Sequence, residues 1–523
     1  MKRCPTCEKT YTDETLKFCR LDGSPLVFFS SDSPTLVFGS GEAAGTETGR
    51  IAPRGRRSPK SKAIDSIAVL PFENLSHDSN TEYLSDGITE TIINNLSQSP
   101  KLKVMARSTV FSYKGQQIDS RQVGNELEVR AVVTGRVQLL GDHLTIAIEL
   151  VDVADGSQLW GERYSRKMTD IFALQEEISG QISAKLRLKL TSSLKKRLSR
   201  LHTKNSEAYQ LYLMGRYFWN KRTEEDANKG IEYFHRALSF DPNFALAFCG
   251  LADCQTLLGD VGIQAMLPKE AFLQGEQSAT RALQIDDALA EAHGTMGHIS
   301  MHLFDWPRAG SELQRAVELN PNYAQAYVWY AYYLAFTGHC ADSLAAIDRS
   351  LKLDPLSLPV NKSAAELLYF AGCFDESIDQ FHKSMELDPD KPQAHLELGR
   401  VYENRKMFEA AITELTKGRE LSHDSPESLA SLAHCYAVSG ATSEAQALLR
   451  DLTQLSEHRY VSPYDLALLH SGLGQKQEAF EWLDRAYEMH DGWMIYVTVD
   501  PRWRPVREDA RFADIVRRVG LAT

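Results

Sequence analysis

Three stretches of the chain end in the same pattern: Ala-Val-Glu-Leu-Asn-Pro at 316–321, Ser-Leu-Lys-Leu-Asp-Pro at 350–355 and Ser-Met-Glu-Leu-Asp-Pro at 384–389. Their final prolines, Pro321, Pro355 and Pro389, are evenly spaced. One further step of the same length in each direction reaches Asp287, after Ala-Leu-Gln-Ile-Asp, and His423, after Gly-Arg-Glu-Leu-Ser. Four consecutive intervals therefore agree, and a fixed period of this length indicates an array of similar units that stack on one another.

Small and apolar residues also recur at fixed places within the units. In the unit that ends at Pro321 they are Gly297, Ala309, Leu313 and Ala316. A 34-residue period with small residues near the eighth and twentieth places and a closing proline resembles the tetratricopeptide repeat. The resemblance covers residues 205–491 and implies about eight units, each a pair of antiparallel helices, that stack into a right-handed α-solenoid. It also implies a surface that binds proteins or peptides.

A polar stripe is expected along the inner wall of this array. In tetratricopeptide arrays the first helix of each unit lines the concave side, so residues at one place recur once in every unit. One such stripe is His298, Tyr332, Glu366, Arg400 and His434. Its mixture of charges and aromatic groups favours capture of a protein or peptide over capture of a polyanion. The alternative is a solvated face with no dedicated ligand.

Residues 64–200, which precede the repeats, show the alternating texture of an α/β domain. The apolar run at 67–70 predicts a buried strand, and apolar residues at helical spacing predict a helix over 83–96. Alternating residues at 131–137, 144–150 and 158–164 predict a β-meander joined by tight turns. A helix from residue 170 to about 200 is expected to close the domain.

Several phrases in this region resemble the TolB amino-terminal-like domain. They are Ile67-Ala-Val-Leu-Pro-Phe72, Tyr83-Leu-Ser-Asp-Gly-Ile88 and Leu159-Trp-Gly-Glu-Arg-Tyr164. In that family the domain commonly precedes tetratricopeptide repeats in bacterial signalling proteins, behind a cyclase, kinase or winged-helix module. The resemblance implies an α/β domain for ligand or protein interaction without established catalysis. Polar or special residues near strand and helix ends are either site candidates or ordinary turn and surface residues: Asp86, Gly87, Arg107, Lys114, Gly115, Trp160 and Arg163.

Residues 1–27 carry a cysteine pattern, Cys4-Pro-Thr-Cys7 followed by Cys19-Arg-Leu-Asp22, that resembles a zinc ribbon. A segment this short cannot build a core without a metal, so the pattern predicts a structural Zn²⁺ held by Cys4, Cys7, Cys19 and Asp22. Asp22 stands where a fourth cysteine is usual, and a metal-free remnant of the motif is the alternative. Residues 28–63 are expected to be a flexible linker, whose end is basic.

Composition limits the remaining choices. The 523 residues carry a net charge of −12, so the chain as a whole lacks the cationic surface of a general nucleic-acid binder. No apolar run is long enough to span a membrane and the start lacks a signal peptide, which predicts a cytoplasmic protein. Phosphate-loop, dinucleotide, zinc-protease, hydrolase-elbow and kinase motifs are missing, and the histidines are scattered, so no enzyme is expected.

The expected architecture is mainly α: a tetratricopeptide α-solenoid over 205–491 with a cap at 492–523, preceded by the α/β domain and the small zinc-ribbon-like head. The expected function is a non-enzymatic scaffold or adaptor in a bacterial-type cytosolic signalling pathway, with its partner in the concave groove. The alternative is a transcription-type regulator that contacts nucleic acid through the head and the basic linker.

Overall fold

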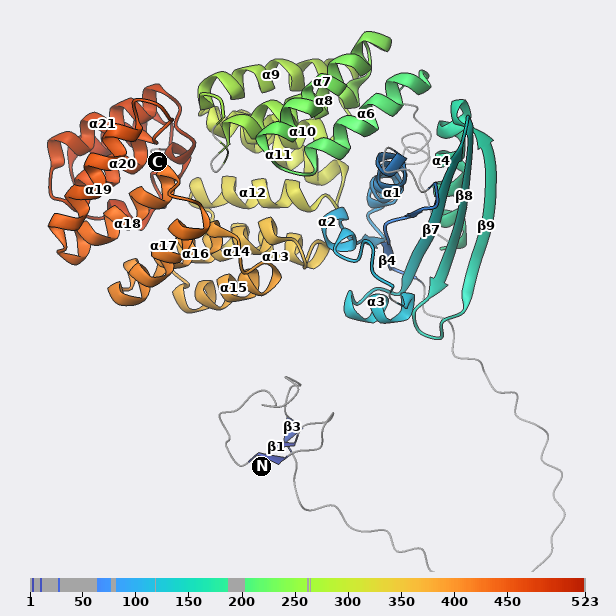
Figure 1. Ribbon diagram of the computed structural model, residues 1–523, viewed down its shortest axis with the longest axis horizontal. Helices are drawn as coiled ribbons and strands as arrows, with labels where there is room; N and C mark the ends of the chain where they lie inside the picture. Colours follow the sequence, from blue (N-terminus) through green and yellow to red (C-terminus); the bar gives the residue numbers. More distant parts are fainter. Residues whose placement is uncertain are drawn as a thin grey trace, which may run out of the picture. The chain divides into compact units, whose positions relative to one another are not determined.

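The computed structural model divides the chain into two compact units, residues 1–61 and 62–523. In the first unit, strands β1 (Lys2–Arg3), β2 (Thr10–Tyr11) and β3 (Val27–Phe28) form an antiparallel sheet in the order β2-β1-β3. The structure describes residues 2–3, 10–11, 27–28, 64–76, 81–117, 119–186, 203–260, 263 and 265–521 (Figure 1). The predicted zinc ligands, Cys4, Cys7, Cys19 and Asp22, and the linker after residue 28 lie outside these described residues.

The second unit begins with an α/β region built on one sheet. Its strands are β4 (Ser66–Val69), β5 (Glu73–Asn74), β6 (Lys103–Val104), β7 (Ala131–Leu140), β8 (His143–Asp152) and β9 (Gln158–Lys167). The order is β6-β4-β7-β8-β9, with β4 parallel to both neighbours and β7, β8 and β9 forming the antiparallel meander. The strands predicted from alternation are thereby confirmed.

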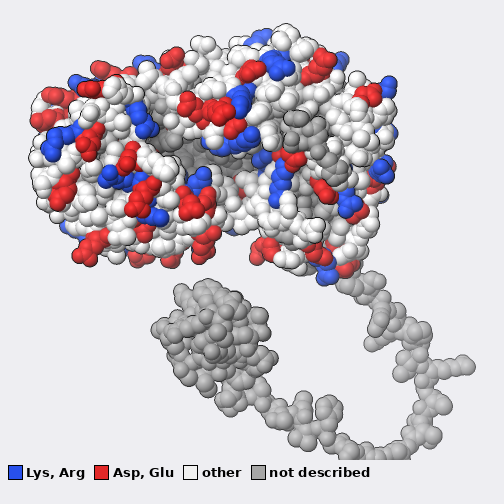
Figure 2. Space-filling view, in the orientation of Figure 1, with Lys and Arg blue, Asp and Glu red and all other residues white. Residues whose placement is uncertain are grey.

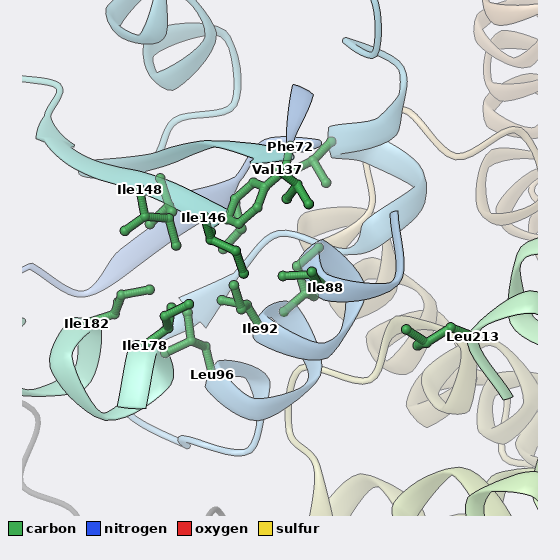
Figure 3. Packing of buried hydrophobic residues seen from close by; sticks show 14 of the residues in the cluster. Phe72, Ile88, Ile92, Leu96, Val137, Ile146, Ile148, Ile178, Ile182 and Leu213 are labelled. Atoms are coloured by element: carbon green, nitrogen blue, oxygen red, sulfur yellow. The ribbon is translucent and has the colours of Figure 1, made fainter. Parts of the chain in front are cut away.

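Two helices, α1 (Glu82–Ser97) and α4 (Ile171–Lys185), contribute the apolar stripes that cover this sheet. Figure 3 shows Ile88 and Ile92 of α1 with Ile178 and Ile182 of α4 beside strand residues such as Ile146. All of them are buried, and each fully buried aliphatic side chain contributes about 1.5–3 kcal/mol. The helix predicted over 83–96 is confirmed. Of the helix predicted from residue 170 to about 200, α4 is the described part, and residues 187–202 lie outside it.

The repeats follow as antiparallel helix pairs. Within the described part of residues 203–491 the structure has eight pairs, and each consists of a first and a second helix. They are α6 (Ser206–Trp219) and α7 (Glu224–Phe240), α8 (Ala245–Gly259) and α9 (Pro268–Ile285), α10 (Ala290–His302) and α11 (Trp306–Leu319), α12 (Ala324–Phe336) and α13 (Cys340–Leu353), α14 (Leu358–Phe370) and α15 (Phe374–Leu387), α16 (Pro392–Asn404) and α17 (Phe408–Leu421), α18 (Pro426–Ser439) and α19 (Thr442–Leu455), and α20 (Pro463–Gly472) and α21 (Lys476–Glu488).

The recurring glycines explain how closely the two helices of a pair approach. A Cβ atom at Gly297 would lie 2.5 Å from Leu313, and one at Gly399 would lie 2.6 Å from Leu415. Real carbon atoms do not pack at such distances, so only glycine allows these contacts. The mainly α fold, with helix pairs in an α-solenoid behind a small α/β region, is confirmed. No helix among the described residues is both long and apolar enough to cross a membrane.

The turns between repeats dock onto the α/β region. Asn322 donates from Nδ2 to the carbonyls of Ser97 and Leu102 at 2.8 and 2.9 Å. Asp354, in the next turn between pairs, accepts hydrogen bonds from the backbone N–H and hydroxyl of Thr109 at 2.9 and 2.7 Å. Since these groups are buried, the α/β region is held to the array by directional bonds as well as by apolar packing.

The C-terminal segment also makes long-range contacts. It comprises η3 (Gly492–Tyr496), η4 (Pro501–Trp503) and α22 (Ala510–Arg518). Helix α22 packs on α21, where Arg518 lies 2.5 Å from Asp484. The chain end then reaches the third helix pair, because the indole N–H of Trp306 donates to the carbonyl of Val519 at 2.7 Å. The segment therefore connects the last helix pair to the third.

Candidate partner-binding groove

The inner wall of the repeats is hollowed by a cavity of about 190 Å³. Its walls come from the first helices of five consecutive pairs, α10, α12, α14, α16 and α18, and its remaining side is η3. The partly exposed residues around it are polar or aromatic: Asp260, His298, Gln325, Trp329, Lys362, Gln393, Glu427 and Tyr496. We call this feature the groove, and its partly exposed residues the rim.

All five residues of the predicted stripe lie on these first helices. His298 is partly buried, whereas Tyr332, Glu366, Arg400 and His434 are buried. Only 1% of the surface of Glu366 and 2% of that of Arg400 is exposed. Charged groups with so little exposure must find partners within the protein. His298 and Tyr332 line the groove, and Glu366 and Arg400 contact its lining residues Lys362 and Glu397. We call the buried stripe residues the floor.

The middle of the floor is a short chain of polar contacts. The hydroxyl of Tyr332 donates to Oε2 of Glu366, and Lys362 Nζ lies 3.2 Å from the same oxygen. Burial raises the pKa of Glu366 above its ordinary value, although the ammonium group of Lys362 opposes this effect. These contacts connect the first helices α12 and α14 at the bottom of the groove.

The next part of the floor is held by Arg400. Its guanidinium donates to Glu397 at 2.6 Å, to Glu427 at 3.0 Å and to the hydroxyl of Ser431 at 2.9 Å. The guanidinium carbon also lies 4.8 Å from the ring centre of Trp493, a cation–π distance. Arg400 thus joins α16 and α18 to η3.

His434 ends the stripe, with Nδ1 3.0 Å from Glu403 Oε1. Like Arg400, it is buried against groups of the same chain. The role of the five stripe residues in holding an outside partner stays a prediction, because in this structure they contact the protein itself.

The C-terminal segment lies directly on the floor. The ring of Tyr496 is 6.0 Å from Tyr332, 4.9 Å from Phe336 and 5.5 Å from Phe370, measured between centroids. Trp493 is 4% exposed, and removing such a side chain from its buried site costs several kcal/mol. The chain itself therefore covers the floor, and the rim is the exposed part of the groove.

The polar residues singled out in the α/β region fall into one ion network and several isolated positions. Lys114 Nζ lies 2.6 Å from both Asp86 and Glu82. Arg107 lies 3.1 Å from Glu90, whose carboxylate also pairs with Arg216 of α6 at 2.8 Å. Trp160 and Arg163 are on β9, and Gly115 takes a left-handed turn conformation with φ of 77°.

Glu90 is the centre of that network. Burial acts to raise its pKa, but the guanidinium groups of Arg216 and Arg107 outweigh burial and lower the pKa below its ordinary value. A carboxylate held between two arginines is a satisfied structural group. The network therefore positions the α/β region on α6.

One group of potential metal-ligating residues lies beside the groove and is not part of any sequence motif described above. Asp260 follows α8, and His298 and His302 are one helical turn apart on α10. One ligand atom of each residue lies within 4.8 Å of the ligand atoms of the other two. The signal in the sequence is the spacing His298-Ile-Ser-Met-His302, which places both rings on one helix face. Asp260 has no such signal, because only the packing of α8 on α10 brings it near.

The outer surface is mixed in charge. Acidic and basic side chains of the described residues are interspersed on the face seen in Figure 2, and the whole chain carries a net charge of −12. A broad basic face of the kind that tracks a phosphate backbone is not present among the described residues in this view.

Comparisons with protein families give two matches. Residues 62–181 match the family "HilA/YgeH-like transcriptional regulator, second domain", and residues 362–426 match the tetratricopeptide repeat. The second match, together with the helix pairs and their period, confirms the tetratricopeptide repeats.

Two curated relatives are similar over part of their length. "Putative adenylate cyclase 3" of Rhizobium meliloti is 39% identical over 194 residues, which are 37% of this chain and 33% of the relative. "Transcriptional regulator HilA" of Salmonella typhimurium is 23% identical over 297 residues, which are 55% of this chain and 51% of the relative. The chain thus spans between a third and about half of the length of these relatives.

Solved structures show distant similarity. A thermophilic tetratricopeptide protein of Thermus thermophilus is 18% identical, with a TM-score of 0.32, covering 37% of this chain and 98% of that one. The human IFIT1 dimer with m7Gppp-AAAA is 15% identical, with a TM-score of 0.40, covering 67% of this chain and 84% of that one.

Proposed function

We propose that this chain is a non-enzymatic scaffold of a bacterial-type cytosolic regulatory pathway, and that a protein or peptide partner binds over the groove of its tetratricopeptide repeats. The observation that carries this proposal is the groove itself, where five consecutive first helices direct polar and aromatic residues into one cavity. Trp329, Gln325 and Gln393 are partly exposed there. Aromatic anchors surrounded by hydrogen-bonding side chains are typical of surfaces that recognise peptides.

The rigid floor supports this proposal. Tyr332, Glu366 and Arg400 are held by buried hydrogen bonds and ion pairs, so the wall beneath a ligand is already ordered before binding. Preorganised sites lose less conformational entropy when a partner binds. The protein's own Trp493 and Tyr496 lie against this floor, which indicates that the groove accepts aromatic side chains carried by a peptide segment.

The absence of enzymatic activity is part of the proposal. The adenylate-cyclase relative matches this chain over 33% of its own length, and this chain carries none of the catalytic sequence motifs named above. The α/β region, which resembles a TolB amino-terminal-like domain and matches the second domain of a transcriptional regulator, is proposed as an interaction domain that accompanies the repeats.

The groove can be tested by site-specific photocrosslinking in native lysate. A crosslinking amino acid at Gln325 or Gln393 samples the rim, and the same group at Gln314, an exposed glutamine on the second helix α11, is the matched control. We expect a discrete protein adduct from the two rim positions and none from Gln314. Equal adducts from rim and control, or none from the rim, would show that the partner binds elsewhere.

A transcription-type regulator is the second candidate, and the similarity to transcriptional regulator HilA over 297 residues favours it. In this proposal the head binds structural Zn²⁺ through Cys4, Cys7, Cys19 and Asp22, and contacts nucleic acid together with the basic linker at 50–62. Phosphate contacts release counterions, so the full chain should shift a DNA or RNA probe in a gel at low salt and lose it as salt rises. A full chain that shifts no probe at low salt rules this candidate out.

A further inference from the structure

Asp260, His298 and His302 form a cluster of metal-ligating groups at one end of the groove. Nε2 of His298 lies 3.8 Å from Oδ1 of Asp260, which is too long for a hydrogen bond. Asp260 ends the first helix of the second pair, and the histidines belong to the first helix of the third pair. Donors from two helix pairs thus converge, and the carboxylate and the nearer imidazole do not satisfy each other.

One histidine of this cluster, His302, differs from His293 and His395 of the same array. Nδ1 of His302 is buried and has no hydrogen-bond partner among the described residues. Nδ1 of His434 also has no hydrogen-bond partner among those residues, but it lies 3.0 Å from Glu403 Oε1. By contrast, the ring of His293 contacts Glu312 at 2.5 Å and the carbonyl of Asp287 at 2.9 Å, so both of its nitrogens are satisfied. His395, three repeats later, has the same two kinds of partner. A buried nitrogen without a partner requires an explanation.

Stacking contacts hold the two rings in place. His302 lies 4.1 Å from the ring of Phe272 with an angle of 8° between the planes, and His298 lies 4.9 Å from Trp329 with an angle of 14°. Because the rings cannot turn freely, the direction of their nitrogen lone pairs is fixed before any ligand arrives. Side chains whose orientation is restricted before binding lose less entropy when they take up a ligand.

The charges around the cluster suit a cation. His298 and His302 supply imidazole nitrogens, and Asp260 supplies a carboxylate oxygen. The positive charge of Arg222 competes with a bound cation for the carboxylate of Asp260. The guanidinium of Arg222 is held 4.3 Å over the ring of Trp219.

We propose that Asp260, His298 and His302 bind a divalent transition metal of the zinc class, such as Zn²⁺ or Co²⁺. Two imidazoles and one carboxylate form a donor set that prefers such ions to Mg²⁺ or Ca²⁺. Bonds of about 2.1 Å in a tetrahedral site place the donors about 3.4 Å apart. The present separations of up to 4.8 Å therefore close by up to about 1.4 Å on binding.

Three protein ligands would leave one coordination position of a tetrahedral ion for a further ligand, and all three residues line the groove cavity. A bound ion would join the second and third helix pairs at this end of the groove. The proposal does not depend on the partner-binding function, because metal uptake is measured without a partner.

The test is metal uptake by the full chain with Cys4, Cys7 and Cys19 replaced by serine, so that the predicted zinc site of the head does not contribute. Co²⁺ is titrated and followed by its visible absorption, and Zn²⁺ binding is measured by calorimetry. We expect one equivalent of metal, with no near-ultraviolet band of thiolate–cobalt charge transfer. A parent protein that takes up neither ion overturns the proposal.

Two variants and a control locate the site. Asp260→Asn and His302→Gln are expected to weaken binding at least about a hundredfold, because loss of an outer-shell partner alone costs about 10–100-fold. His293→Gln, which changes a satisfied histidine on the same helix, should bind like the parent. Circular dichroism establishes that each variant is folded. Unchanged binding by both site variants, or equal loss in the His293 control, overturns the assignment.

Discussion

Replacing Asp354 by alanine should detach one corner of the α/β region from the repeats. The Asp354 carboxylate is 4% exposed and accepts from the N–H and hydroxyl of Thr109, at 2.9 and 2.7 Å, and from the hydroxyl of Ser108. Alanine leaves these buried donors without an acceptor. Each unsatisfied buried donor costs about 1–3 kcal/mol. Removing the carboxylate also removes the cost of burying its charge, which offsets part of that sum. We therefore expect the free energy of unfolding to fall by about 3 kcal/mol.

Hydrogen exchange followed by mass spectrometry measures this loss locally. The amides of Ala106 and Thr109 bond across the junction, to Leu353 and Asp354, and exchange only when it opens. A loss of about 3 kcal/mol should accelerate their exchange roughly a hundredfold. Asp388, at the same repeat position in the next unit, is only partly buried, so Asp388→Ala is the matched control. Unchanged exchange in peptides covering 104–112, or an equal change in the control, would refute the reasoning.

Two further predictions concern the C-terminal half. Trp503 is fully buried, and its indole N–H donates to Tyr464 at 2.7 Å. Trp503→Ala should therefore destabilise the chain by about 3–5 kcal/mol and expose the C-terminal segment to protease. An unchanged Tm together with a segment that resists protease would contradict this prediction. Burial raises the pKa of Asp465 to about 7. Between about pH 4 and 7, Asp465 therefore stays protonated in the folded state but loses its proton in the unfolded state. The free energy of unfolding should fall as pH rises through this range. Asp465→Asn should remove this slope from thermal melts recorded across that range, and a slope that survives would show that another group causes it.

The helix pairs could be predicted from the sequence because their determinants are local and repeated. Gly297 and Gly399 occupy the same repeat place and face Leu313 and Leu415 at nearly the same distance. The β-meander was likewise predictable, since alternation records which side of each strand is buried. In both cases the information lies within one unit of the chain.

Long-range partners could not be predicted in this way. Leu353-Asp354 and Leu387-Asp388 read identically, yet only Asp354 is buried at the α/β region. The stripe residues were recognisable by their period, but nothing in that period shows that Trp493, from beyond the last helix pair, lies over Arg400. The spacing of His298 and His302 likewise gives no sign of Asp260, because Asp260 reaches them from another helix pair.

These long-range contacts change how the array can respond to a partner. In an open solenoid each repeat contacts only its neighbours, so the concave side can widen or narrow with small changes at each interface. Here Asp354 ties the fourth pair to the α/β region, and Trp306 ties the third pair to the chain end at Val519. A change in the curvature of the groove would have to break buried bonds of both kinds. These contacts therefore oppose a change in the width of the groove, and the proposed partner would bind a rim that is already ordered.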